Sequence, residues 1–186
     1  MILQTEPSDE AELVEQAKAD TTAFGELYQR YVGRIYSYVY NRTGNQSDAE
    51  DLTERVFVQA LTHLRGYTYR GLPFSVWLFR IAHNVVANWH RDRQRNKTVP
   101  MDDATLTAEM GTDRLEMVED VAQLRRAMTK LPQDRQQLLL LKFNEELSHA
   151  EIGKIMNRSE GAVKALLHRT LKALKHELQG ALDEGH

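Results

Sequence analysis

Residues 147–175 read LSHAEIGKIMNRSEGAVKALLHRTLKALK, and this stretch predicts a helix-turn-helix. Ser148 and Glu151 have the S-x-x-E spacing of a capping box, in which two side chains satisfy free amides in the first turn of a helix. Leu147 before the cap and Ile152 within the helix are placed to form a hydrophobic staple. The first helix of the motif should therefore begin at Ser148.

A tight turn and a second helix should follow. The first helix should end near Met156, because Asn157 tolerates the left-handed backbone conformation that a tight turn needs. Gly153 lacks a side chain where two helices crossing at a steep angle would collide, and Ser159 can cap the second helix. Apolar residues then recur at helical spacing: Val163, Leu166, Leu167, Leu171 and Leu174.

The second helix is basic, which favours contact with DNA. Its cations are Lys164, Arg169, Lys172 and Lys175, with Arg158 at its start. A helix in this position can approach phosphates and reach base edges in a major groove. The alternative is an ordinary helical hairpin with a solvated basic face.

The charge of the whole chain is less informative than its distribution. The 186 residues carry a formal charge of −3, which is unusual for a protein that binds nucleic acid. However, residues 101–120 hold a cluster of acids against a single arginine, and the flanking segments are basic. The acids are Asp102, Asp103, Glu109, Asp113, Glu116, Glu119 and Asp120.

Cysteine usage and hydropathy predict a cytoplasmic protein. We also expect neither a metal nor a cofactor. The chain has no cysteine, which excludes disulfides and thiolate metal sites. No apolar run approaches the length of a membrane span, and the N-terminus lacks a signal-peptide pattern.

Helical periodicity over most of the chain predicts an all-α protein with two helical domains joined by a flexible acidic linker. We expect helices over about 8–19, from 21 or 22 to between 41 and 44, over 74–95 and over 133–144. Another should open with a capping box at Ser47 and Glu50, and its inward residues should be Leu52, Val56, Ala60 and Leu64. Periodicity also resumes from Leu115 to Met128.

A second candidate interface lies around residues 74–95, where aromatic residues alternate with arginines. Exposed rings stack on unpaired bases and arginine neutralises the backbone, so the pattern fits single-stranded nucleic acid. Trp77, Ile81 and Val85 are expected in the core. For Tyr67, Tyr69, Trp89 and the arginines, the alternative is a solvated surface.

The residues Asp48-Ala49-Glu50-Asp51-Leu52, then Phe57, then Phe74-x-x-Trp77-Leu78-x-x-Ile81-Ala82-x-Asn84, resemble the core of bacterial sigma factors. With Leu131-Pro132 and the terminal helix-turn-helix, the layout is similar to the extracytoplasmic-function (ECF) group of the sigma-70 family. The resemblance implies a non-enzymatic protein that binds RNA polymerase core and directs it to promoters. It also implies a sigma-2 domain over 1–97, a linker over 98–112 that follows the RNA exit path, and a sigma-4 domain over 113–186.

The same resemblance assigns residues to three surfaces, which would contact the β′ clamp helices and β flap of the polymerase and promoter DNA. Docking on the β′ clamp helices is assigned to Asp48, Glu50, Asp51, Glu54 and Phe57, with Phe57 as an exposed apolar ring. Recognition and opening of the −10 element is assigned to Tyr67, Tyr69, Arg70, Arg80, Asn84, Arg91 and Arg93. Recognition of the −35 element is assigned to Arg158, Ser159, Glu160, Ala162, Lys164, His168 and Arg169.

Two other functions fit parts of the pattern. A DNA-binding regulator that never joins the polymerase would need the helix-turn-helix but not the acidic helix after Asp48. A metal-dependent enzyme would use the histidines, but no HExxH or His-x-x-x-His pair is present. An anti-sigma factor is the usual further partner in the resembling family.

Overall fold

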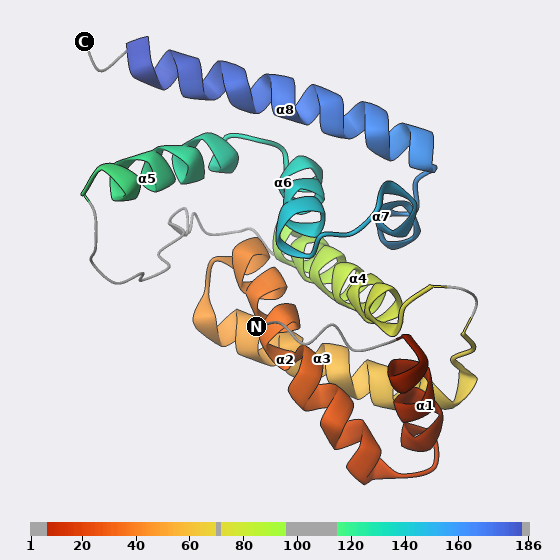
Figure 1. Ribbon diagram of the computed structural model, residues 1–186. Helices are drawn as coiled ribbons and strands as arrows, with labels where there is room; N and C mark the ends of the chain where they lie inside the picture. Colours follow the sequence, from red (N-terminus) through yellow and green to blue (C-terminus); the bar gives the residue numbers. More distant parts are fainter. Residues whose placement is uncertain (1–6, 70–71, 96–114, 184–186) are drawn as a thin grey trace. The chain divides into compact units, whose positions relative to one another are not determined.

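The structure is a computed structural model, and it describes residues 7–69, 72–95 and 115–183. The chain divides into two compact units, Met1–Ala104 and Thr105–His186 (Figure 1). The described residues form helices and turns and contain no strand, which confirms the expected all-α fold. The predicted linker over 98–112 lies outside the described residues, so the domain boundaries at its two ends stay predictions.

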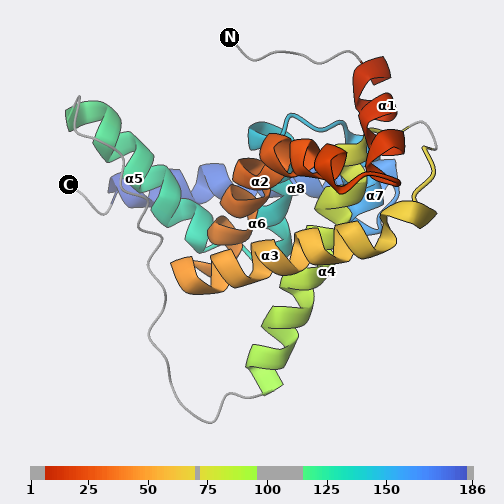
Figure 2. The same ribbon diagram turned by 90° about the horizontal axis from the view of Figure 1, so that it is seen from below.

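Over its described residues, the N-terminal unit forms four α-helices and a short 3-10 turn. They are α1 (Pro7–Ala17), α2 (Thr21–Thr43), α3 (Gln46–His63), the turn η1 (Leu64–Gly66) and α4 (Phe74–Arg95). Helices α2 and α3 run side by side and α4 crosses them, as Figure 2 shows, while α1 packs on α2.

Local capping signals set the ends of α2. Asp20 caps its start, since its carboxylate accepts from the amide of Thr22 at 2.8 Å. Gly44 ends the helix with a φ of 65° and donates its amide to the carbonyl of Tyr40, a conformation that costs glycine no steric strain.

The predicted capping box at Ser47 and Glu50 is wrong. Asn45 is the cap of α3, because its side-chain oxygen accepts from the amide of Asp48 at 3.0 Å. The helix therefore starts at Gln46, whose side-chain amide donates to Glu50 one turn later.

Apolar residues of α2, α3 and α4 form most of the core of this unit, and α1 adds Leu13, Val14 and Ala17. Those predicted to point inward from α3 and its end, Leu52, Val56, Ala60 and Leu64, are all buried. They meet Leu27 and Ile35 of α2 and Leu78, Phe79 and Ala82 of α4, which are also buried. Each large side chain contributes on the order of 2 kcal/mol when removed from water.

The C-terminal unit consists of α5 (Leu115–Thr129), α6 (Gln133–Leu139), the π-helical turn η2 (Leu140–Asn144), α7 (His149–Met156) and α8 (Glu160–Asp183). Helix α8 is the long blue helix of Figure 1, and α5, α6 and α7 all pack against it. The core of the C-terminal unit includes Leu138, Leu141, Ile152, Ile155, Val163 and Leu166.

The helix predicted over 133–144 has the expected bounds, but its last turn, η2, is π-helical. The helical turn widens after Leu139. The amide of Glu145 donates to the carbonyl of Leu140, five residues earlier, at 3.2 Å. Glu146 follows with a φ of 54°, and this left-handed residue turns the chain toward α7.

Candidate nucleic-acid and protein interfaces

The first helix of the expected helix-turn-helix begins as predicted. The hydroxyl of Ser148 accepts from the amide of Glu151 at 3.2 Å, and the carboxylate of Glu151 accepts from the amide of Ser148 at 2.7 Å. Both halves of the capping box are therefore formed. Leu147 and Ile152 are buried, as expected for a staple.

The turn of the motif is closed by backbone contacts. Asn157 has φ 54° and ψ 49°, which confirms the left-handed turn residue. The amide of Arg158 donates to the carbonyl of Gly153 at 2.9 Å. A Cβ atom on Gly153 would lie 2.6 Å from the carbonyl oxygen of Arg158, so glycine permits this close approach. Ser159 caps α8 by accepting from the amide of Ala162 at 3.2 Å.

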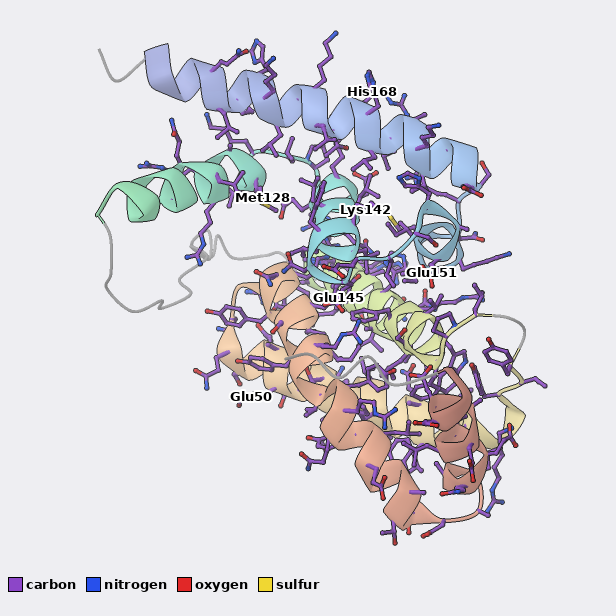
Figure 3. All side chains as sticks on the ribbon, in the orientation of Figure 1. Glu50, Met128, Lys142, Glu145, Glu151 and His168 are labelled. Carbon is purple, nitrogen blue, oxygen red and sulfur yellow. The ribbon has the colours of Figure 1, made fainter. Side chains whose placement is uncertain are left out.

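Helix α8 divides into a buried face and an exposed face. Val163, Leu166 and Thr170 are buried. All seven residues assigned to the −35 element are exposed: Arg158, Ser159, Glu160, Ala162, Lys164, His168 and Arg169. Figure 3 shows His168 on the side of α8 that faces away from α6 and α7. The exposed face is therefore accessible to a DNA groove.

Arg158 also has an ion-pair partner that the sequence did not indicate. Its guanidinium lies 3.3 Å from the carboxylate of Asp134 on α6, and both side chains are exposed by about two fifths. A pair of this kind contributes about 0–1 kcal/mol to stability, and it orients the arginine at the start of α8.

A second polar face runs along α4. Arg80, Asn84, Asn88, Arg91 and Arg95 are exposed and follow one another at spacings of four, four, three and four residues. Residues at this spacing lie on one side of a helix. Three of the residues assigned to the −10 element, Arg80, Asn84 and Arg91, therefore share one continuous surface.

The two tyrosines before α4 differ in exposure. Tyr69 is 54 % exposed, whereas Tyr67 is only 9 % exposed, so the expectation of an exposed Tyr67 ring is wrong. Its ring centroid lies 5.0 Å from that of Trp77 and 5.6 Å from that of Phe74. Burial raises the pKa of Tyr67 to about 12. Arg70 lies outside the described residues.

Residues assigned to different partners form an ion pair. A guanidinium nitrogen of Arg93 on α4 lies 3.2 Å from a carboxylate oxygen of Asp48 on α3. The same guanidinium lies over the ring of Trp89, 4.9 Å from its centroid. The sequence did not predict this contact, because the two residues are 45 positions apart.

The exposed apolar residues on the outward face of α3 are not the one that was predicted. Asp51 and Glu54 are exposed as expected. Phe57 is only 6 % exposed and packs edge-on against Tyr28, with centroids 4.7 Å apart, so the expectation of an exposed ring is wrong. Val58 and Leu61 are instead 57 % and 44 % exposed. They follow Asp51 and Glu54 by seven residues each, a helical spacing from which this face could have been predicted.

His90 is a half-buried histidine on α4. Burial, followed by the charge of Arg42, lowers the pKa of His90 to about 4. Across the part of the chain that the structure describes, no group of three or more acidic, histidine or cysteine side chains could hold a metal ion. Within the same residues, none of the helices is both long and apolar enough to span a membrane.

Comparisons with known proteins assign each unit to a conserved region. The family profile of sigma-70 region 2 matches residues 27–96, and that of sigma-70 region 4 matches residues 122–174. The chain is 38 % identical to the ECF RNA polymerase sigma factor BldN of Streptomyces coelicolor over 168 residues, which cover 88 % of this chain and 63 % of BldN. It is 31 % identical to the ECF sigma factor SigW of Bacillus subtilis over 180 residues, 87 % of this chain and 92 % of SigW.

Solved structures show the same fold. A structure of CnrH in complex with the cytosolic domain of CnrY is 22 % identical, with a TM-score of 0.66 and coverage of 95 % of this chain and 99 % of that one. A structure of the sigma factor RpoE with the anti-sigma factor NepR from Bartonella quintana is 19 % identical, with a TM-score of 0.68 and coverage of 84 % and 96 %.

An all-helical chain in which region 2 precedes region 4 has the architecture of an RNA polymerase sigma factor. The chain belongs to the extracytoplasmic-function group of the sigma-70 family. Members of this family bind RNA polymerase core and direct promoter-specific initiation of transcription. The comparisons favour this function over that of a regulator that never joins the polymerase.

Proposed function

We propose that the outward face of α3 is the surface that docks on the β′ clamp helices of the polymerase. The exposed carboxylates of Asp51 and Glu54 suit a basic partner, and Val58 and Leu61 supply an apolar centre between them and the end of the helix. Glu50 lies at the edge of this face, and Asp48 is engaged by Arg93.

The exposed face of α4 is proposed to bind the −10 element. Arginines at its two ends, Arg80 and Arg91, suit the backbone, and Asn84 between them can donate and accept hydrogen bonds on a base edge. Tyr69 is the exposed ring available for stacking on an unpaired base. Tyr67 instead has a structural role, since its ring packs on Phe74 and Trp77. Arg70 and Arg93 keep their assignment to this surface as predictions.

The exposed start of α8 is proposed to read the −35 element. In a helix-turn-helix, the N-terminal residues of the second helix reach the base edges first. Arg158, Ser159 and Lys164 occupy that end of α8 and are exposed. Glu160, Ala162, His168 and Arg169 share the exposed surface. Two further partners remain predictions from the family: the β flap of the polymerase and an anti-sigma factor. A cytoplasmic location and the absence of catalytic activity and of a cofactor also remain predictions.

The observation that carries this proposal is the ordered pairing of regions 2 and 4 on two separate helical units. Transcription with purified core polymerase on a library of randomised promoters tests it. The proposal predicts transcripts only when the protein is present, from templates enriched in two separated sequence elements. Sequence-specific DNA binding without core, and no transcripts with it, would instead identify a polymerase-independent regulator.

A further inference from the structure

The carboxylate of Glu10 on α1 joins three helices of the N-terminal unit. One oxygen accepts from the backbone amide of Phe74, the first residue of α4, at 3.1 Å. The other accepts from the hydroxyl of Tyr31 on α2. Glu10 is half-buried, and Phe74 and Tyr31 are buried, so these contacts are partly shielded from water. A single side chain thus connects α1, α2 and the start of α4.

Helix α4 needs such a contact because its own sequence does not supply a cap. Leu72 and Pro73, which precede it, carry no side-chain acceptor for the free amides of the first turn. Glu10 supplies that acceptor from 64 residues away. A negative charge at this end of a helix is also favoured by the helix dipole.

The same helix start holds the loop before α4. The ring of Phe74 lies 5.7 Å from that of Tyr31 and 5.6 Å from that of Tyr67, centroid to centroid. Tyr67 is the residue from which the loop departs, and Phe74 follows the residue at which it ends. Both ends of the loop are therefore attached to one aromatic cluster, and Glu10 fixes that cluster to α1. The charge of Glu10 contributes, after burial, to the raised pKa of Tyr67.

We propose that Glu10 is a positioning residue for promoter opening. It fixes the first turn of α4 and, through Phe74, the ring of Tyr67, and so it positions the exposed face of α4 and the neighbouring Tyr69 ring for an unpaired base. Glu10 itself does not contact DNA or polymerase. The inference rests on the proposed −10 role of Tyr69 and of α4, and it adds α1 to the parts of the chain that promoter opening requires.

The test compares Glu10→Ala and Glu10→Gln with Glu12→Ala in the full chain bound to core polymerase. Glu12 is a matched control, since it is exposed on the same helix. Glu10→Ala should slow open-complex formation on duplex promoter about tenfold, the size expected for the loss of a helix cap. A premelted template should restore normal initiation, and the affinity for core should stay within about twofold of wild type, well below the tenfold effect on opening.

Two further readouts separate positioning from general destabilisation. Glu10→Gln keeps one carbonyl acceptor, so it should lie between wild type and Glu10→Ala. Hydrogen exchange in Glu10→Ala should accelerate at the amides of Phe74 and its neighbours more than at those of α3. Equal acceleration throughout the N-terminal unit, or a defect that persists on the premelted template, would overturn the inference.

Asn84→Ala separates this inference from the proposed function. If Asn84→Ala opens duplex promoter slowly while Glu10→Ala behaves as wild type, the role of Glu10 is wrong and the −10 surface stands. If both variants open the duplex normally, the −10 assignment and the role of Glu10 fall together.

Discussion

At the scale of a single residue, backbone strain at Glu146 lowers the stability of the fold. Glu146 has a φ of 54°, in the left-handed region where a Cβ atom is crowded. A non-glycine residue in this conformation costs roughly 1–2 kcal/mol. Glycine would remove this cost without altering the turn between η2 and α7.

We therefore expect Glu146→Gly to stabilise the protein by about 1 kcal/mol. The free energy of unfolding, measured by urea denaturation, should rise for the transition of the C-terminal unit. Asn144→Gly is the matched control, because Asn144 is exposed and does not have a positive φ. It should be neutral or destabilising. Stabilisation by both substitutions would show that removing any side chain here suffices.

Phe57 and Val58 are neighbours in the chain, but Phe57 is buried and Val58 is exposed. Substitutions at the two positions therefore distinguish an effect on stability from an effect on docking. Phe57→Ala should cost about 3–5 kcal/mol, because Phe57 is buried against Tyr28. Val58→Arg should change stability by less than about 0.5 kcal/mol, because Val58 is exposed. The affinity of Val58→Arg for core polymerase should nevertheless fall at least about tenfold. In the proposed complex Val58 is covered by the partner, and the substitution places a charge there.

Thermal unfolding and co-elution with core polymerase give the two readouts. A Phe57→Ala protein of normal stability would contradict the burial of the ring. A Val58→Arg protein that still co-elutes with core would show that another surface docks on the polymerase.

At the scale of an element, the helix-turn-helix was predictable because its signals are local. Ser148 and Glu151 are three residues apart, as are Ser159 and the amide that it caps, so the sequence alone indicates both contacts. The cap of α3 was mispredicted for a related reason. Asn45 and Ser47 are both good cap residues, and their positions in the chain do not decide between them.

Contacts between elements were not predictable in the same way. Phe57 of α3 packs on Tyr28 of α2, and Tyr67, which precedes α4, packs on Trp77 within that helix. The exposed face of α4 was partly predicted, because the family resemblance assigned Arg80, Asn84 and Arg91 to the −10 surface. The cap that Glu10 provides to α4 could not be foreseen, since no local rule joins residues 64 positions apart.

The start of α8 allows a prediction about how an element reads DNA. Arg158→Ala and Lys164→Ala should each weaken recognition of the −35 element. If a side chain contacts guanine with two hydrogen bonds, the loss should be about 1–3 kcal/mol and confined to particular bases. If it binds phosphate, the loss should be similar for all sequences, and the salt dependence of binding should become shallower.

Binding of the protein–polymerase complex to promoter variants at several salt concentrations distinguishes these outcomes. Both positions are exposed, and the Arg158 ion pair with Asp134 contributes little to stability. Asp134→Ala serves as a control for the loss of that pair. Unchanged −35 recognition in both the Arg158 and Lys164 variants would exclude the start of α8 as the reading surface.

At the scale of the whole molecule, the two units have two different proposed tasks. The C-terminal unit presents a basic helix that suits duplex DNA, and the N-terminal unit presents a polar face and an exposed ring that suit separated strands. The sequence indicated this arrangement through the order of its motifs, and the family profiles match each region in turn. The division of labour between the units is the central claim.

Initiation measured on duplex and premelted versions of one promoter tests this claim most directly. Tyr69→Ala and Asn84→Ala should each initiate poorly on the duplex. The first loses stacking on an unpaired base, which contributes roughly 1–3 kcal/mol, and the second loses hydrogen bonds to a base edge. Both should recover on the premelted template, where strand opening is no longer required. Arg158→Ala should stay defective on both templates, because its task precedes opening. Recovery of all three variants, or of none, would contradict the assignment of duplex recognition to α8 and strand opening to α4.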